Sequence, residues 1–141
     1  MYTTILYATD LSENHFKMCQ KAADIATHFH AKLYLMHVIE PPATLQLAQG
    51  LGFAEFDRPI KADAETVMRT LGEALNIPVD QQFVEIGSIK THVLSKADAL
   101  DCNLIIIGSH AKSNIPEFLG STAHAVVNHA PCDVLTLRES I

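Results

Sequence analysis

No stretch of this 141-residue sequence approaches the run of about 20 apolar residues that a membrane-spanning helix requires. The first residues carry no basic leader, and their apolar run is too short for the core of a signal peptide. The ten Lys and Arg residues are scattered, the net charge is −6, and no basic run occurs. Because nucleic acids and anionic membranes attract clustered positive charge, we expect a cytoplasmic protein that binds neither.

Cysteine is scarce, and several common motifs are missing. Cys19, Cys102 and Cys132 form no CxxC pair and have no zinc-ligand spacing, so we expect reduced thiols. The sequence lacks G-x-x-x-x-G-K-[ST], which excludes a P-loop NTPase, and it lacks the G-x-S-x-G nucleophile elbow. No G-x-G-x-x-G follows the first apolar run, which argues against a dinucleotide site.

The sequence does contain an alternation of strand-like and helix-like segments. Strands are predicted at residues 4–9, 32–39, 81–87, 103–108 and 133–137. Helices are predicted from Ser12 to Phe29, with Phe16 and Cys19 inward, and at residues 60–75, 88–100 and 122–129, while 42–59 reads as a loop. Such alternation favours parallel βαβ units, and hence one domain over residues 1–141 with a three-layer α/β/α sandwich around a five-stranded parallel sheet.

Ligands of open parallel sheets bind beyond the carboxyl ends of the strands, where the strand order reverses. If the first predicted strand is central, the second and fourth strands are among its neighbours. Three short segments then converge at that edge of the sheet: Ala8-Thr9-Asp10, His37-Val38-Ile39 and Gly108-Ser109-His110.

The segment between two glycines, Gly108 and Gly120, suits an anionic ligand. Gly108 ends a buried strand where a side chain would crowd a ligand, and Gly120-Ser121-Thr122 opens a helix whose free N–H groups attract anions. Lys112 could supply a counter-charge, and Asp10 could accept hydrogen bonds from ribose hydroxyls or an amine. These features together predict a nucleotide site, with base and sugar near the first strand and phosphates near the fourth.

Each of these residues also has a purely structural interpretation. Gly108 and Gly120 could serve only as turn and cap glycines, and Asp10 could serve only as part of a helix cap. Lys112 could be a solvated loop residue, and His37 could be a histidine of the core or of a strand edge. The functional interpretation therefore depends on the co-location of these residues.

Four blocks of the sequence carry a family resemblance: ILYATDLS, LYLMHVIEPP, VEIGS and IIIGSHAKSNIPEFLGSTAHAVVNHAPCDVLTL. Through them the chain resembles the universal stress protein family over essentially its whole length. The last block is the most specific, because GSH, LGS, the HAPC turn and the closing strand occur in the family's order. The resemblance implies a Rossmann-like, adenine-nucleotide alpha-hydrolase-like fold, ATP with Mg²⁺ as ligand, homodimers and a role in stress responses.

The resemblance also implies roles for individual residues. Asp10 would contact the adenosine, Ala8 and Thr9 would line its wall, and Val38 would meet adenine through its backbone. The remaining contacts would come from Gly108, Ser109 and His110 at the ribose and first phosphates, and from Gly120, Ser121 and Thr122 at the phosphate tail, with Mg²⁺ bound through the triphosphate. The chain departs from the family's G-x2-G-x9-G-[ST] signature, since Ala111 replaces the second glycine and the following spacer is one residue shorter.

Three functions are compatible with this sequence. The first is an ATP-binding regulatory module of the stress response, which acts on a protein partner that the sequence does not identify. The second is an interaction protein of the same fold that binds no nucleotide. The third is a slow ATPase or phosphotransferase, although no residue stands out as a base that would activate water.

The last strand is expected at an edge of the sheet, where an exposed apolar strand invites pairing. The resemblance implies a homodimer that pairs this strand through Val134, Leu135, Thr136 and Leu137. The alternative is that residues 138–141 shield the edge.

Overall fold

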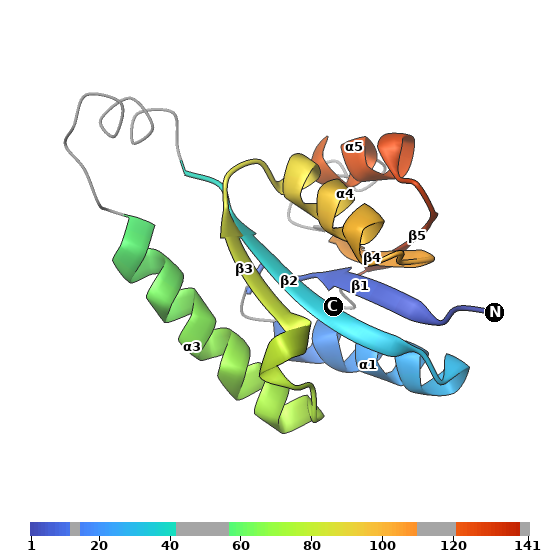
Figure 1. Cartoon of the computed structure of the whole chain (residues 1–141), viewed down its shortest axis with the longest axis horizontal. Coiled ribbons are helices and arrows are strands. Elements are labelled where there is room, and N and C mark those ends of the chain that lie inside the picture. Colours follow the sequence, from blue (N-terminus) through green and yellow to red (C-terminus); the bar gives the residue numbers. More distant parts are fainter. Residues whose placement is uncertain (12–14, 42–56, 110–120, 139–141) are drawn as a thin grey trace.

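The computed structural model describes residues 1–11, 15–41, 57–109 and 121–138, which form a parallel sheet with helices on both faces (Figure 1). The strands are β1 (Thr4–Ala8), β2 (Lys32–Ile39), β3 (Gln82–Ile86), β4 (Leu104–Ser109) and β5 (Asp133–Arg138). The helices are α1 (His15–Phe29), α3 (Asp57–Leu75), the 3₁₀ turn η1 (Val79–Gln81), α4 (Ile89–Ala99) and α5 (Ser121–His129). The predicted three-layer α/β/α architecture is confirmed.

The five strands lie in the order β3-β2-β1-β4-β5, and all four neighbouring pairs are parallel. The first strand is therefore central, which is the condition under which the three predicted loop segments converge. From β1 the chain builds outward through β2 to β3, and it then returns to the other side of β1 to add β4 and β5. The order reverses between β1 and β4, which is where this class of sheet binds its ligands.

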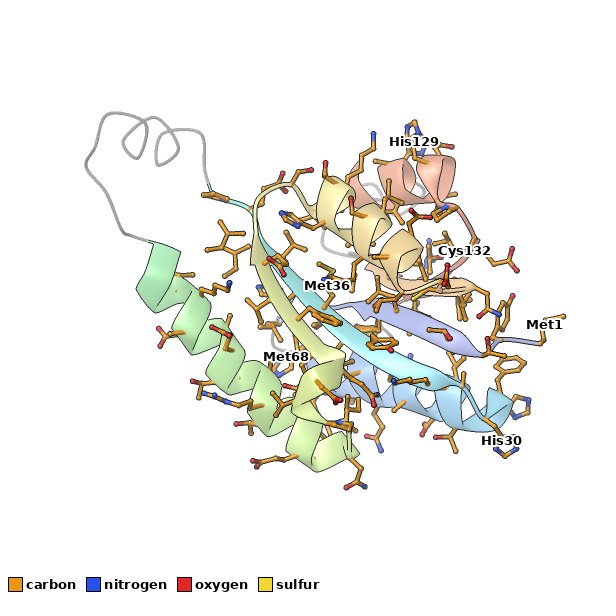
Figure 2. The ribbon with its side chains drawn as sticks, in the orientation of Figure 1. Met1, His30, Met36, Met68, His129 and Cys132 are labelled. Atoms are coloured by element: carbon orange, nitrogen blue, oxygen red, sulfur yellow. The ribbon has the colours of Figure 1, made fainter. Side chains whose placement is uncertain are left out.

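Two hydrophobic clusters fill the space between the sheet and its helices. Because strand side chains alternate between faces, Ile5 of β1 packs with α1 and α3, while Leu6 packs with α4 and α5. Met68 of α3 and Met36 of β2, both labelled in Figure 2, belong to these two different clusters. The runs of branched residues in β1 and β4 follow from this double coverage.

The structure corrects some predicted boundaries and one inward residue. Helix α3 begins at Asp57, within the predicted loop, because Pro59 falls in its first turn, where a missing N–H group costs no helical hydrogen bond. Phe16 was expected inward, but it is 45% exposed, and the buried stripe of α1 consists of Met18, Cys19, Ala22 and Ala26. Among the described residues, no helix is long and apolar enough to cross a membrane.

The amino ends of β1 and β4 are joined by one side chain. The side-chain oxygen Oδ1 of Asn103 accepts hydrogen bonds from the backbone N–H groups of Thr3 and Thr4 at 3.1 and 3.2 Å. The Asn103 N–H donates in turn to the Thr4 carbonyl at 3.0 Å. These contacts fix the register of β1 against β4, and therefore which residues meet at the opposite end of the two strands.

Candidate functional site

The register of the three central strands brings three of the predicted site residues, Ala8, Val38 and Gly108, to the same end of the sheet. Ala8 pairs with Met36 on one side and with Ile107 on the other. Val38 therefore lies just beyond the end of β1 on one side, and Gly108 lies just beyond it on the other. Ala8, Val38 and Ile107 belong to one hydrophobic cluster, so they line the same face of the sheet.

The turn that follows β1 is held by three hydrogen bonds. The Thr9 N–H donates to the Met36 carbonyl at 2.8 Å, and the Leu11 N–H donates to the Thr9 hydroxyl at 3.2 Å. His37 Nδ1 lies 2.8 Å from the Thr9 carbonyl. Leu11 has a φ of 54°, which bulky residues rarely adopt. These hydrogen bonds therefore stabilise a backbone conformation that is intrinsically unfavourable for leucine. Asp10 is exposed at the apex of this turn.

The side chains beneath the turn are neutral and buried. Thr9, at 5% exposure, is the buried polar residue in the described part of the chain. Burial raises the pKa of the Cys19 thiol to about 12, although its hydrogen bond with the Thr9 hydroxyl acts in the opposite direction. Burial also raises the pKa of the Tyr7 hydroxyl, and the negative charge of Asp10 adds to both rises. Asp10 therefore places a carboxylate at the mouth of the site, above a layer of groups that stay uncharged.

Gly108 follows the buried residues of β4, and the described part of the chain shows no structural need for a glycine there. Its φ lies outside the left-handed region that favours glycine. Among the described residues, a Cβ built at this position would meet only the Met18 Cε atom within 4 Å, at 3.5 Å, which is an ordinary van der Waals contact. Within that part of the chain, neither the backbone nor the packing explains the glycine.

The phosphate side of the predicted site is described only in part. Helix α5 begins at Ser121, one residue before its predicted start, and Thr122 is half-buried. Ala123 of this helix is buried in the same cluster as Val38 and Ile107, so the start of α5 lies beside the end of β4. The predicted contacts His110, Lys112 and Gly120 lie outside the described residues.

His37 is a residue whose role the sequence left open. Its ring does not lie in a purely apolar setting, because the Thr9 carbonyl faces Nδ1 at 2.8 Å. Since a carbonyl oxygen can only accept, Nδ1 carries the hydrogen and donates it. Only the position of His37 opposite the end of β1 in a parallel pair could have indicated this contact from the sequence.

The strand β5 lies at an edge of the sheet, as expected. Leu135 is 36% exposed, and Val134, Thr136 and Leu137 are half-buried. Leu137 packs against the cluster beneath α1, and Val134 packs against the cluster beneath α4 and α5. The outer backbone of this strand has no neighbouring strand in the described part of the chain.

Comparison with known proteins gives a consistent result. The model of the universal stress protein family matches residues 1–138. Universal stress protein A homolog 2 of Coxiella burnetii is 34% identical over 139 residues, covering 97% of this chain and 95% of that protein. Universal stress protein G of Salmonella typhimurium is 28% identical over 144 residues, covering 98% of this chain and 100% of that protein.

Solved structures share the same fold. The universal stress protein UspA from Lactobacillus plantarum superposes with a TM-score of 0.73 and 26% identity, covering 97% of this chain and 98% of that one. A universal stress protein crystallised in complex with cAMP gives a TM-score of 0.70 at 19% identity, covering 99% of this chain and 98% of that one.

Proposed function

This chain belongs to the universal stress protein family, and we propose that its residues 1–141 form one domain that binds ATP, with Mg²⁺, between the carboxyl ends of β1 and β4. In this proposal the protein is a cytoplasmic regulatory module of the stress response, whose nucleotide-bound state alters its interaction with a protein partner. Mg²⁺ enters on the triphosphate and shields its charge.

The observation that carries the proposal is Gly108 at the switch point. Neither its backbone conformation nor the packing of the described residues around it requires a glycine. A glycine that this part of the fold does not need, at the position where open parallel sheets bind ligands, supports close approach of a ligand to the backbone. The structure solved with cAMP supports an adenine nucleotide as a ligand class for this fold.

In this proposal, two groups of residues around Gly108 contact different parts of the nucleotide: one contacts the adenosine and the other contacts the phosphates. Asp10 is exposed beside the end of β1 and would accept hydrogen bonds from the ribose, while Ala8, Thr9 and Val38 would line the base. The phosphates would lie over the first turn of α5, where free N–H groups and the helix dipole favour negative charge. The residues proposed for that half are Ser109, His110, Lys112, Gly120, Ser121 and Thr122.

We also propose that two copies pair through β5. An exposed edge strand with an apolar residue such as Leu135 is a pairing surface unless something covers it. Pairing of Val134, Leu135, Thr136 and Leu137 with the same residues of a second copy would cover both edges. This dimer is compatible with nucleotide binding and with a purely interacting protein.

The proposal is tested by calorimetric titration of nucleotide-free protein with ATP and Mg²⁺, with GTP as the comparison ligand. We expect saturable binding of ATP in the micromolar range. Asp10→Ala should weaken binding, because it removes the exposed carboxylate proposed to contact the ribose. Gly120→Asp places a carboxylate among the proposed phosphate contacts and should abolish binding.

Two results would favour the other functions. Absence of heat and of a thermal shift at millimolar ATP would identify a dimeric interaction protein without nucleotide. Release of phosphate above the level of the Gly120→Asp variant would identify a slow ATPase, and equal release would exclude one.

A further inference from the structure

The pairing of β1 with β2 stops at a defined point. Ala8 and Met36 are the last registered pair, and the Thr9 N–H donates to the Met36 carbonyl at 2.8 Å. In a parallel ladder each residue directs its N–H and its carbonyl to the same neighbouring strand. The next rung would therefore join the Val38 N–H to the Thr9 carbonyl, but the register ends before it.

The side chain of His37 explains why this rung is not formed. Nδ1 of His37 donates to the Thr9 carbonyl at 2.8 Å, which is a short and well-formed hydrogen bond. The Thr9 carbonyl thus has a partner from β2 that is a side chain, while the backbone of β1 turns away through Leu11 with its φ of 54°. His37 is half-buried, on the same face as Leu35 and Ile39, so its ring is held in place.

We propose that His37 is a positioning residue for the ligand's base. By satisfying the Thr9 carbonyl, it ends the ladder one rung early and leaves the Val38 N–H directed into the switch point. This inference rests on the proposed nucleotide site, because it assigns that N–H to the bound base. A single N–H donor there matches adenine, whose N1 accepts a hydrogen bond, and opposes guanine, whose N1 carries a hydrogen.

Two isosteric substitutions separate this role from a general structural one. In His37→Asn the side-chain amide nitrogen occupies nearly the position of Nδ1 and can still donate, whereas His37→Leu has a similar shape and no donor. We expect His37→Leu to lose about tenfold in ATP affinity, the equivalent of one hydrogen bond. GTP affinity should change little, and His37→Asn should bind ATP nearly as the parent does.

Amide hydrogen exchange of the free protein gives a readout that does not require ATP. In His37→Leu the Thr9 carbonyl is released, the missing rung can form, and exchange of the Val38 amide should slow. A merely structural defect would speed exchange around the turn instead. His92→Leu is the matched control, because His92 Nε2 contacts the Ile86 carbonyl at 3.2 Å at the end of the edge strand β3.

The outcomes distinguish this inference from the proposed function. Slower Val38 exchange in His37→Leu, but not in His37→Asn or His92→Leu, supports the role of His37, and unchanged or faster exchange overturns it. If the parent protein binds no ATP, the nucleotide proposal fails while the exchange result still decides what His37 does. If ATP binds and His37→Leu binds it with parental affinity and preference over GTP, the assignment of the base to Val38 is overturned.

Discussion

Ala8 and Ile107 are the last registered pair across the boundary between β1 and β4, where the strand order of the sheet reverses. Beyond this pair the two strands are no longer paired with each other: β1 leads into the turn at Asp10, and β4 continues to Gly108. The separation creates a place where backbone groups from two strands face the same space. The position of the proposed site thus follows from topology, and its proposed chemistry depends on the residues just beyond the last pair.

The first prediction concerns Gly108. Because a Cβ fits beside Met18 among the described residues and the φ of Gly108 is one that alanine adopts, Gly108→Ala should keep or raise the free energy of unfolding, by up to about 1 kcal/mol. The same substitution should weaken ATP binding, since the methyl group narrows the approach to the end of β4. Urea unfolding and calorimetric titration measure the two effects separately.

Gly87 provides the matched comparison. Its φ is +143° and an added Cβ would lie 2.8 Å from His92 Nε2, so Gly87→Ala should lower the free energy of unfolding, by about 1–3 kcal/mol. Equal destabilisation by the two alanines would show that Gly108 is a structural glycine after all. Unchanged ATP affinity in Gly108→Ala would remove the ligand-based explanation.

The second prediction concerns the pH dependence of stability. Burial raises the pKa of the Cys19 thiol from 9.0 to about 12, so the folded chain keeps a proton that the unfolded chain releases. The contribution is complete below pH 9 and is lost as the pH rises toward 12, at about 1.4 kcal/mol per pH unit for one proton. Tyr7, whose pKa burial also raises, adds to the loss above its ordinary value of 10.0.

Urea unfolding across this alkaline range is the measurement, with Cys19→Ala as the comparison. The variant should begin from lower stability, because it leaves a small cavity, but its slope against pH should be smaller by one proton. Parallel curves for the two proteins would mean that Cys19 ionises equally in both states.

Much of the fold could be predicted because its signals are local. The branched residues of β4 and the breaks at strand ends gave the alternation of elements, and the alternation implies the parallel sheet. The exposure of Phe16 could not be predicted from such local signals. Both Phe16 and Met18 satisfy an apolar spacing around Cys19, and only the packing of α1 on the sheet selects Met18.

The site could be predicted to the level of its segments but not of its contacts. Asp10 follows β1, and Val38 and Gly108 lie near the carboxyl ends of β2 and β4, so their convergence follows from topology. The role of His37 depends on where the β1–β2 register ends and on a side chain that reaches across to a backbone carbonyl. Neither the end of the register nor this side-chain contact produces a periodic pattern or a motif in the sequence. The sequence therefore did not decide the role of His37.

The third prediction tests the turn after β1. The Thr9 hydroxyl accepts from the Leu11 N–H and hydrogen-bonds with the Cys19 thiol. Thr9→Val keeps the shape and removes the hydroxyl, so it leaves these groups without that partner and should cost about 1–3 kcal/mol of unfolding free energy. Thr9→Ser keeps the hydroxyl and should cost less. Urea unfolding of both variants checks the order, and the reverse order would show that the methyl group matters more than the hydrogen bonds.

The fourth prediction concerns assembly through β5. If two copies pair along this edge, Leu135 lies at the junction, and Leu135→Lys should separate them by placing like charges against each other. Because Leu135 is already 36% exposed, the single chain should remain folded and elute with the 15.5 kDa mass of a monomer in light-scattering chromatography. Val127→Lys is the control: Val127 is 43% exposed and belongs to α5 and not to β5, so this variant should keep the parental mass. A monomeric parent protein, or a Leu135→Lys variant that stays dimeric, would show that β5 is not the pairing surface. A dimer that separates only in Leu135→Lys would also allow ATP affinity to be compared in the two states, which tests whether the edge of the sheet and the switch point are coupled.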